Sequence, residues 1–335
     1  MPQSIDILNN IRLNASEEYQ ARIPEATQTN ITEIGNAFET YTVLYNEFCT
    51  ALLNKIGKTI IEQKMFKNRL AKYKDGTIHN AQDVEEIFIE MAKAEGAYDP
   101  DGKNPLGRRD NPDVKAIYHR QNRRDKYVIT VGDIDFRRVF RNGDTLDVFI
   151  KGLINSVYSG DAYDEYLCMK NILATYPGYD EYEVTAYTKA NAVAFAKEFV
   201  KTLRKAVLDL TLEPSTEHNA AGVLTFSDVD KLTLFIHKDV ATEIDVELLA
   251  NAFNQSNTDT KVVPDIQVMA NFGSLTDTYA LLTDRDFLKV WDTLSHMEGQ
   301  RNADGLFTNY FYHHHQILSA SKFKNAIRFK AKAGA

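Results

Sequence analysis

Apolar residues recur at helical spacing in three segments of the chain, and each segment predicts a helix that turns one face to a core. The helices are expected over residues 31–56, 144–176 and 191–210, with Gly57 ending the first and a kink near Gly160 in the second. The side chains that define the three faces are Phe38, Tyr41, Tyr45, Phe48 and Leu52; Leu146, Phe149, Leu153 and Val157; and Phe195, Phe199, Leu203 and Val207.

Four shorter segments have the composition of strands, at residues 182–188, 231–240, 265–272 and 278–284. A short helix is expected over residues 245–254, between the second and the third of them. Helices and strands are interleaved at irregular spacing, with no internal repeat and no strand–helix unit with a Gly-rich turn. The expected fold class is therefore α+β.

Residues 58–131 carry many charges and few core residues, which is typical of an extended excursion from the fold. A short amphipathic helix is expected over residues 83–95, and the Gly, Pro and Asp residues of 96–113 predict a loop. A β-ribbon is expected next, with Asn122 near its turn. The first 30 residues show no periodicity and are interpreted as an irregular arm.

The composition narrows the class of function. The net charge of −8 and the pI of about 5.6 argue against a generic nucleic-acid binder, which is usually basic. Cys49 and Cys168 form no CxxC pair, so a cysteine-based zinc site is excluded and both are interpreted as buried thiols in a reducing compartment. No signal peptide and no membrane-spanning apolar run is recognisable, so the protein is expected to be made in the cytosol.

Three consecutive histidines are the most conspicuous candidate for chemistry. If they lie on a strand, His313 and His315 point to one face and His314 to the other. A metal site needs convergent ligands, and no HExxH motif or second ligand cluster at metal spacing is visible in the sequence. A structural role in a strand is the favoured interpretation, with metal binding and pH sensing as alternatives.

No catalytic motif is recognisable either. The chain has no GxSxG elbow and no GxxxxGK[ST] phosphate loop. The acidic pairs Asp284/Asp286 and Asp133/Asp135 are the best general-base candidates, but aspartates at turns and helix starts are the simpler interpretation. The sequence therefore predicts neither an enzyme nor a cofactor.

A basic strip over residues 103–141 is the strongest candidate for an interaction surface. On an extended ribbon these cations can pair with acidic side chains of another subunit or bind phosphate. A charged surface that contacts only solvent is an equally simple interpretation. The residues predicted to make contacts between subunits are Arg108, Arg109, Arg120, Arg123, Arg124 and Lys126, with Glu17 and Glu18 as acidic counterparts.

Three segments near the end of the chain resemble major capsid proteins of small tailed bacteriophages. They are "KLTLFIHKDVATEIDVELLANAFN" at 231–254, "TYALLTDRDFLKVWDTL" at 278–294 and "RNADGLFTNYFYHHHQILSASKFKNAIRF" at 301–329. The features that carry the resemblance in the last segment are Asn302, Gly305, Leu306, Asn309, Tyr310, Phe311, Ser319, Ser321, Phe323, Asn325, Ala326 and Phe329. The three segments span roughly residues 230–330 and follow the same order as in that family.

The resemblance implies the Hong Kong 97-type capsid fold. It divides the chain into an N-terminal arm and helix at 1–57, an extended loop at 58–131, a peripheral domain with a long spine helix at 132–180, an axial domain at 181–290 and a return strand of the peripheral domain at 291–335. The extended loop is expected to overlap a neighbouring subunit. The deletion of residues 103–125 is expected to leave a folded protein that forms no particles.

The resemblance also implies partners. The subunit is expected to form pentamers and hexamers of an icosahedral phage head, assembled in the host cytoplasm and incorporated into the virion. A separate scaffolding protein, a portal protein and packaged double-stranded DNA bound without sequence specificity are expected partners, and no membrane is. Because the arm is short, we expect no segment to be removed during maturation.

Three rival hypotheses remain at this point. An encapsulin-type nanocompartment shares the fold but encloses protein cargo. A metal-dependent enzyme could be built on His313–His315, and a nucleic-acid-binding module could use the basic strip.

Overall fold

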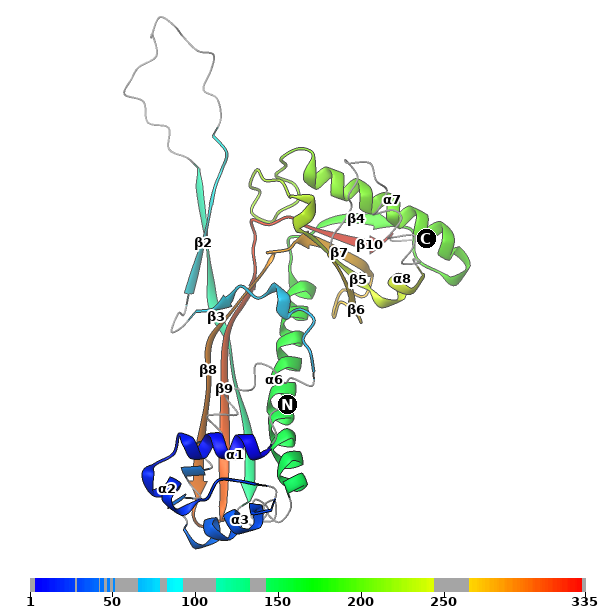
Figure 1. The fold of residues 1–335 in the computed structure, drawn as a ribbon. Coiled ribbons are helices and arrows are strands. Elements are labelled where there is room, and N and C mark those ends of the chain that lie inside the picture. Colours follow the sequence, from blue (N-terminus) through cyan, green and yellow to red (C-terminus); the bar gives the residue numbers. More distant parts are fainter. Residues whose placement is uncertain are drawn as a thin grey trace, which may run out of the picture.

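The protein is an elongated molecule with two five-stranded sheets and one long helix (Figure 1). The computed structural model describes residues 4–27, 29–41, 43–44, 47–48, 51, 66–78, 83–92, 113–132, 143–243 and 265–332. The long helix lies beside the first sheet, three short helices lie at one end of that sheet, and the second sheet lies beyond its other end (Figure 1). A two-stranded ribbon projects away from the rest of the molecule.

The first sheet has the strand order β1–β8–β9–β3–β2. Its strands are β1 (Gly76–Thr77), β8 (Leu288–Asn302), β9 (Phe307–Ala320), β3 (Val114–Gly132) and β2 (Asp83–Ile89). The 19-residue strand β3 has two partners in succession. Its first part pairs with β2 to form the projecting ribbon, and its second part pairs with β9 inside the body.

The helix expected over residues 144–176 is confirmed as α6 (Gly143–Thr175). It is helical throughout, including Gly160. A stripe of its buried side chains recurs every three or four residues and faces the first sheet: Tyr158, Ala162, Glu165, Met169 and Leu173. Among the described helices none is long and apolar enough to cross a bilayer.

The second sheet has the strand order β4–β10–β7–β5–β6. The four strands expected from composition are confirmed as β4 (Asp180–Val184), β5 (Leu232–His237), β6 (Asp265–Met269) and β7 (Thr278–Asp284), and β10 (Ala326–Ala331) joins them. Helix α7 (Ala192–Thr211) covers this sheet with Phe195, Phe199 and Leu203, and α8 (Lys238–Glu243) follows β5. The helix expected over 245–254 lies outside the described residues.

A shared core connects the two sheets. Met169 and Leu173 of α6 pack in one cluster with Phe235 of β5 and Val290 of β8. Tyr73, from the short 3₁₀ helix Ala71–Tyr73, packs against the ring of Phe235 with centroids 5.6 Å apart. The long helix and both sheets are therefore held by one apolar cluster.

Two sequence-based expectations are wrong. Residues 83–89 form strand β2 rather than a helix, and every second residue is exposed because the ribbon buries one face only. The N-terminal segment is not irregular, because it forms α1 (Ser4–Leu13) and α2 (Glu17–Arg22), which pack against α6 and the lower part of the first sheet. The side chains that these two helices and their flanks bury are Leu8, Ile11, Tyr19 and Ile23.

The helix expected over residues 31–56 is also corrected. Helix α3 (Ile31–Thr40) ends at Thr40, and Tyr41 has non-helical backbone angles. Phe38 and Phe48, expected on one stripe, do pack together with ring centroids 4.9 Å apart. The domain boundaries inferred from the family resemblance stay predictions.

Candidate functional site at the root of the ribbon

Strand β3 changes partner at a bulge between Gln121 and Arg123. Asn122 lies in this bulge, and its side chain replaces the missing backbone pairing of the strand. Its amide nitrogen donates to the Leu318 carbonyl at 2.6 Å, and its amide oxygen accepts from the Leu318 N–H at 2.9 Å. The turn expected near Asn122 is therefore a bulge within a continuous strand, and this bulge is where the ribbon leaves the body.

A polar cluster fixes the root of the ribbon to the end of β9. His119 is buried, and its two ring nitrogens contact a carboxylate oxygen of Glu86 at 3.0 Å and the Ser319 hydroxyl at 2.7 Å. The other carboxylate oxygen of Glu86 accepts from the Ser321 hydroxyl at 2.9 Å. Burial alone raises the pKa of Glu86, but hydrogen bonds from His119 and Ser321 outweigh it and lower the pKa, so Glu86 stays charged.

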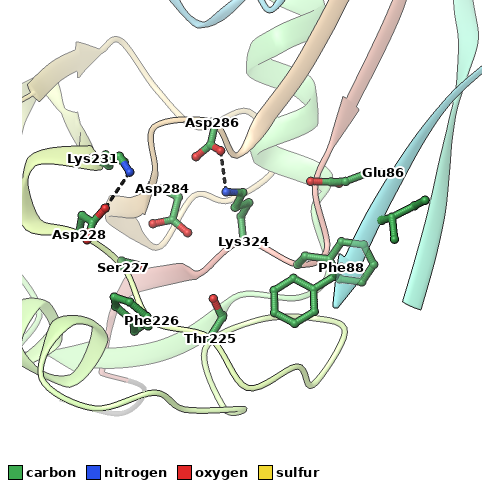
Figure 2. Close-up of a pocket in the computed structure, with 12 residues that line it drawn as sticks. Glu86, Phe88, Thr225, Phe226, Ser227, Asp228, Lys231, Asp284, Asp286 and Lys324 are labelled. Atoms are coloured by element: carbon green, nitrogen blue, oxygen red, sulfur yellow. Dashed lines mark hydrogen bonds and ion pairs between the residues drawn. The ribbon is translucent and has the colours of Figure 1, made fainter. Parts of the chain in front are cut away.

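A cavity of about 220 Å³ lies between the ribbon and the second sheet (Figure 2). Figure 2 shows Phe88 of the ribbon at one side and Phe226 at the other. In its lining the Asp286 carboxylate accepts from Lys324 at 2.6 Å, and Asp228 pairs with Lys231 at 2.7 Å. The cavity is therefore lined by paired charges with aromatic walls.

A buried network of charged side chains lies below the root, between α6 and the first sheet. The guanidinium of Arg123 donates to the Asp161 carboxylate at 2.8 Å and to Tyr127 at 2.9 Å. Both Arg123 and Asp161 are less than 5% exposed. Burial alone lowers the pKa of Arg123, but Asp125 and Asp161 outweigh it and raise the pKa, so the guanidinium stays charged.

The same network continues toward β8 through a lysine. Lys74 Nζ lies 2.7 Å from the Glu165 carboxylate and 2.8 Å from the Asp292 carboxylate. Gln316 donates to Glu165 at 2.7 Å and to Asp292 at 2.6 Å. Burial alone raises the pKa of Glu165, but the charge of Lys74 outweighs it and lowers the pKa.

Glu165, Asp292 and His314 offer three ligand atoms within 4.8 Å of one another, which is the spacing of a metal site. The ammonium group of Lys74 already neutralises two of these ligands. The arrangement is therefore explained by side chains of the chain itself and does not fit an additional cation.

His314 lies between two carboxylates. Its Nδ1 is 2.7 Å from Asp161 and its Nε2 is 3.2 Å from Asp292. Carboxylates only accept, so both ring nitrogens must carry protons to satisfy both contacts. Burial alone lowers the pKa of His314, but its hydrogen bonds to Asp161 and Asp292 outweigh it and raise the pKa. With His314 protonated, the cations Arg123, Lys74 and His314 are matched by Asp161, Glu165 and Asp292, and the partly exposed Asp125 is a further carboxylate at Arg123.

Stability should therefore depend on the protonation of His314. A raised folded-state pKa means that this contribution is complete below the unfolded-state pKa of about 6.5 and is lost as pH rises through the folded-state value. We expect the free energy of unfolding of the unassembled subunit to fall by up to about 1.4 kcal/mol per pH unit in that window. Urea unfolding at a series of pH values measures this slope. The variant His314→Gln should be less stable and should lack the slope, and equal slopes in both proteins would contradict the assignment.

The ribbon carries an exposed apolar surface on the face turned away from the body. Cross-strand pairs put Ile87 opposite Ala116 and Ile89 opposite Val114. Ile87, Ile89 and Val114 are each more than half exposed. Hydrophobic side chains clustered on a narrow projecting element are typical of a contact surface for another protein.

The family follows from comparison with known proteins. A family model described as "Phi29-like phage major capsid protein" matches residues 8–330 of the chain. The chain belongs to this family. As a phage major capsid protein, it is a structural component of the virion.

Relatives named major capsid protein match nearly the whole length of this chain. The chain is 34% identical to the major capsid protein of Bacillus phage B103 over 98% of its own length and 73% of the relative. It is 30% identical to the major capsid protein of Streptococcus phage Cp-1 over 96% of its length and 93% of the relative. The capsid assignment is thereby favoured over a nanocompartment with protein cargo and over a metal-dependent enzyme.

Solved structures support the fold of the capsid protein. The structure titled "Capsid structure of Staphylococcus phage Andhra" matches with a TM-score of 0.59 at 14% identity, covering 82% of this chain and 86% of that one. The structure titled "Asymmetric unit of bacteriophage PhiM1 mature capsid" matches with a TM-score of 0.52 at 8% identity, covering 81% and 89%. The mixed helix-and-sheet fold is thus shared with phage capsid structures.

The residues predicted to contact other subunits lie in different settings. Arg124 is exposed, Arg120 is 3.8 Å from Asp83 on the outer face of the ribbon, and the Lys126 ammonium lies 5.6 Å from the centre of the Phe311 ring. Arg108 and Arg109 lie outside the described residues. Glu17 and Glu18 form the exposed first turn of α2, where they complement the helix dipole, and Glu18 also pairs with Arg22 at 3.3 Å.

The prediction for Arg123 is corrected, because this side chain is buried inside the subunit rather than presented at a surface. The deletion of residues 103–125 is therefore no clean test of the ribbon, since it removes the buried side chains of both His119 and Arg123.

Of the acidic pairs considered as general bases, Asp284 accepts from the Asn325 N–H at 2.9 Å and Asp286 pairs with Lys324. Asp284 is the last residue of β7 and Asp286 lies in the turn between β7 and β8, in agreement with the simpler interpretation. Asp133 and Asp135 lie outside the described residues.

Sequence reasoning missed most of the buried network. Its members are Lys74, Asp161, Glu165 and Asp292, together with the inward-facing His314. One signal was available, because Asp161 and Glu165 are four residues apart within the apolar stripe of a helix. Carboxylates at that position are buried only when they are paired, so they predict cations on the facing element.

Proposed function

We propose that this capsid protein assembles with copies of itself into the closed icosahedral shell of a phage head that encloses double-stranded DNA. The observation that best supports this proposal is the exposed apolar face of the ribbon, around Ile87, Ile89 and Val114. The subunit that carries this face belongs to a family of phage major capsid proteins. An isolated subunit gains nothing from this apolar surface, whereas a neighbouring copy can bury it.

The architecture supports a Hong Kong 97-type subunit. In this proposal the β2–β3 ribbon is the extended loop, α6 is the spine helix of the peripheral domain, and the second sheet with α7 belongs to the axial domain at the centre of pentamers and hexamers. The N-terminal helices α1 and α2 take the place of the arm. Repetition of modest contacts around a closed shell then supplies the stability of the particle.

Partners and location follow from this proposal. A scaffolding protein directs assembly in the host cytoplasm, a portal protein occupies one vertex, and the DNA inside is bound without sequence specificity. The net charge of −8 is compatible with this role, because a shell confines DNA without having to bind it tightly. Nothing in the proposed role requires catalysis, a cofactor or a membrane.

Sedimentation and negative-stain microscopy test the proposed function. The protein is expressed alone and together with candidate scaffolding proteins encoded near it. Uniform closed shells are expected in at least one of these conditions, and shells from infected cells should contain DNA. A small oligomer in every condition, or shells that hold only protein cargo, would contradict the proposal.

A further inference from the structure

Three neighbouring histidines lie on the face of the first sheet that turns away from α6. Strand register puts His296 of β8 directly opposite His313 of β9. His315 follows two residues later on the same face of β9, and the rings of His313 and His315 are 6.5 Å apart between centroids at 90°. His314, between them, points to the opposite face and into the buried network. The three outward histidines occupy neighbouring positions on two adjacent strands.

These histidines differ from the others that the structure describes. His119, His218, His237 and His314 each have a carboxylate near a ring nitrogen. Among the described residues, the ring nitrogens of His296, His313 and His315 have no hydrogen-bond partner. His296 is exposed and the other two are half-buried, so all three side chains are at least partly accessible to solvent. Three unpaired imidazoles on two adjacent strands can serve together as metal ligands.

We propose that His296, His313 and His315 form a surface binding site for a borderline divalent metal ion, with Zn²⁺ as its best-suited occupant. Imidazole nitrogens are ligands for Zn²⁺, Ni²⁺ and Cu²⁺, and Zn²⁺ accepts three of them with a water in the fourth position. The site is separate from the buried group of Glu165, Asp292 and His314, where Lys74 is the cation.

The strand geometry favours this set of ligands. Directly opposite residues on antiparallel strands have Cβ atoms about 4.5–5.5 Å apart, so His296 and His313 can each reach one ion at the Zn–N distance of about 2.0–2.1 Å. His315 has its side chain on the same face as His313, but the ligand atoms of the three histidines do not all lie within 4.8 Å of one another in this structure, so His315 has to rotate about its side-chain bonds to join the other two at one ion. The backbone of two paired strands holds all three positions before any ion binds.

The neighbouring charges set how tightly the ion is held. Burial, and then the positive charge of Arg124, lower the pKa of His315. The same charge of Arg124, which lies beside His315 in the strand register, repels a bound cation. No carboxylate pairs with these rings among the described residues, and second-shell partners of this kind are worth about 10–100-fold in metal affinity. The site should therefore bind more weakly than a closed structural zinc site.

Calorimetric titration of Zn²⁺ into the tag-free, full-length subunit tests the proposal. We expect one ion per subunit, with affinity falling as pH drops and the imidazoles become protonated. His296→Gln and His313→Gln should each weaken binding by about tenfold or more, since loss of a direct ligand costs at least as much as loss of a second-shell partner. Arg124→Gln should tighten binding, an effect that a structural role of the histidines does not produce.

The matched control is His237→Gln, because His237 lies in the second sheet and pairs with Asp239. This variant should bind Zn²⁺ as the wild type does, and circular dichroism should show that every variant is folded. Because His296 is exposed, its substitution leaves the core intact. Binding that is absent from the wild type, or that survives His296→Gln and His313→Gln unchanged, would overturn the proposal.

Discussion

Arg123→Leu should lower the free energy of unfolding of the unassembled subunit by about 3–5 kcal/mol, because it breaks a buried ion pair and leaves its partner charged. The guanidinium of Arg123 contacts Asp161 at 2.8 Å and Asp125 at 2.5 Å, and Asp161 has almost no exposure to water. With Arg123 gone, Asp161 and Glu165 stay buried and Asp292 partly buried, and only Lys74 and His314 remain as cations for these three carboxylates. Urea unfolding at constant pH measures the loss.

The adjacent residue provides the matched control. Arg124 has the same side chain on the opposite face of β3, where it is exposed and donates to Gln121 at 3.1 Å. Arg124→Leu should change the free energy of unfolding by about 0.5 kcal/mol or less, as is usual for surface substitutions. A similar effect of the two substitutions would mean that the buried network contributes little to the stability of the subunit.

Ile87→Asp combined with Ile89→Asp should abolish particle formation while the subunit stays folded. Both side chains are more than half exposed, so a charge at either position costs the isolated subunit little. Burying an aliphatic side chain of this size in a contact contributes about 1.5–3 kcal/mol, and the loss recurs at every subunit of a shell. Sedimentation shows whether particles form, and circular dichroism shows whether the subunit is folded.

Ile87→Val combined with Ile89→Val is the control for this prediction, since it keeps the apolar surface and the β-strand propensity. Its particles should form as those of the wild type do. Normal shells from the aspartate variant would show that the outer face of the ribbon is not a contact between copies.

The elements that the sequence predicted well are those whose burial pattern repeats within one segment. Helices α6 and α7 each bury a continuous stripe, and β5 is buried on nearly all sides, so their residues alone reveal them. Strand β2 is different because Val84, Ile87 and Phe88 fit a helical face as well as a strand. Its partner β3 follows after a long intervening segment, and that pairing leaves no mark in the local sequence.

The candidate site depends even more on strand pairing, which the local sequence does not reveal. Arg123 and Arg124 are equal members of a basic strip in the sequence, and only the register of β3 separates the buried one from the exposed one. The histidine triplet was divided correctly, with His314 on one face and its neighbours on the other. The third outward histidine, His296, could not be assigned to them because its position opposite His313 depends on the pairing of β8 with β9.

The central claim is that the subunit builds a shell in which the ribbon contacts another copy of the chain. A cryo-electron microscopy reconstruction of the assembled particle tests this claim most directly. We expect a closed icosahedral shell in which the face formed by Ile87, Ile89 and Val114 is buried against a neighbouring subunit. A shell in which this face stays exposed to solvent, or packs only against its own subunit, would contradict it.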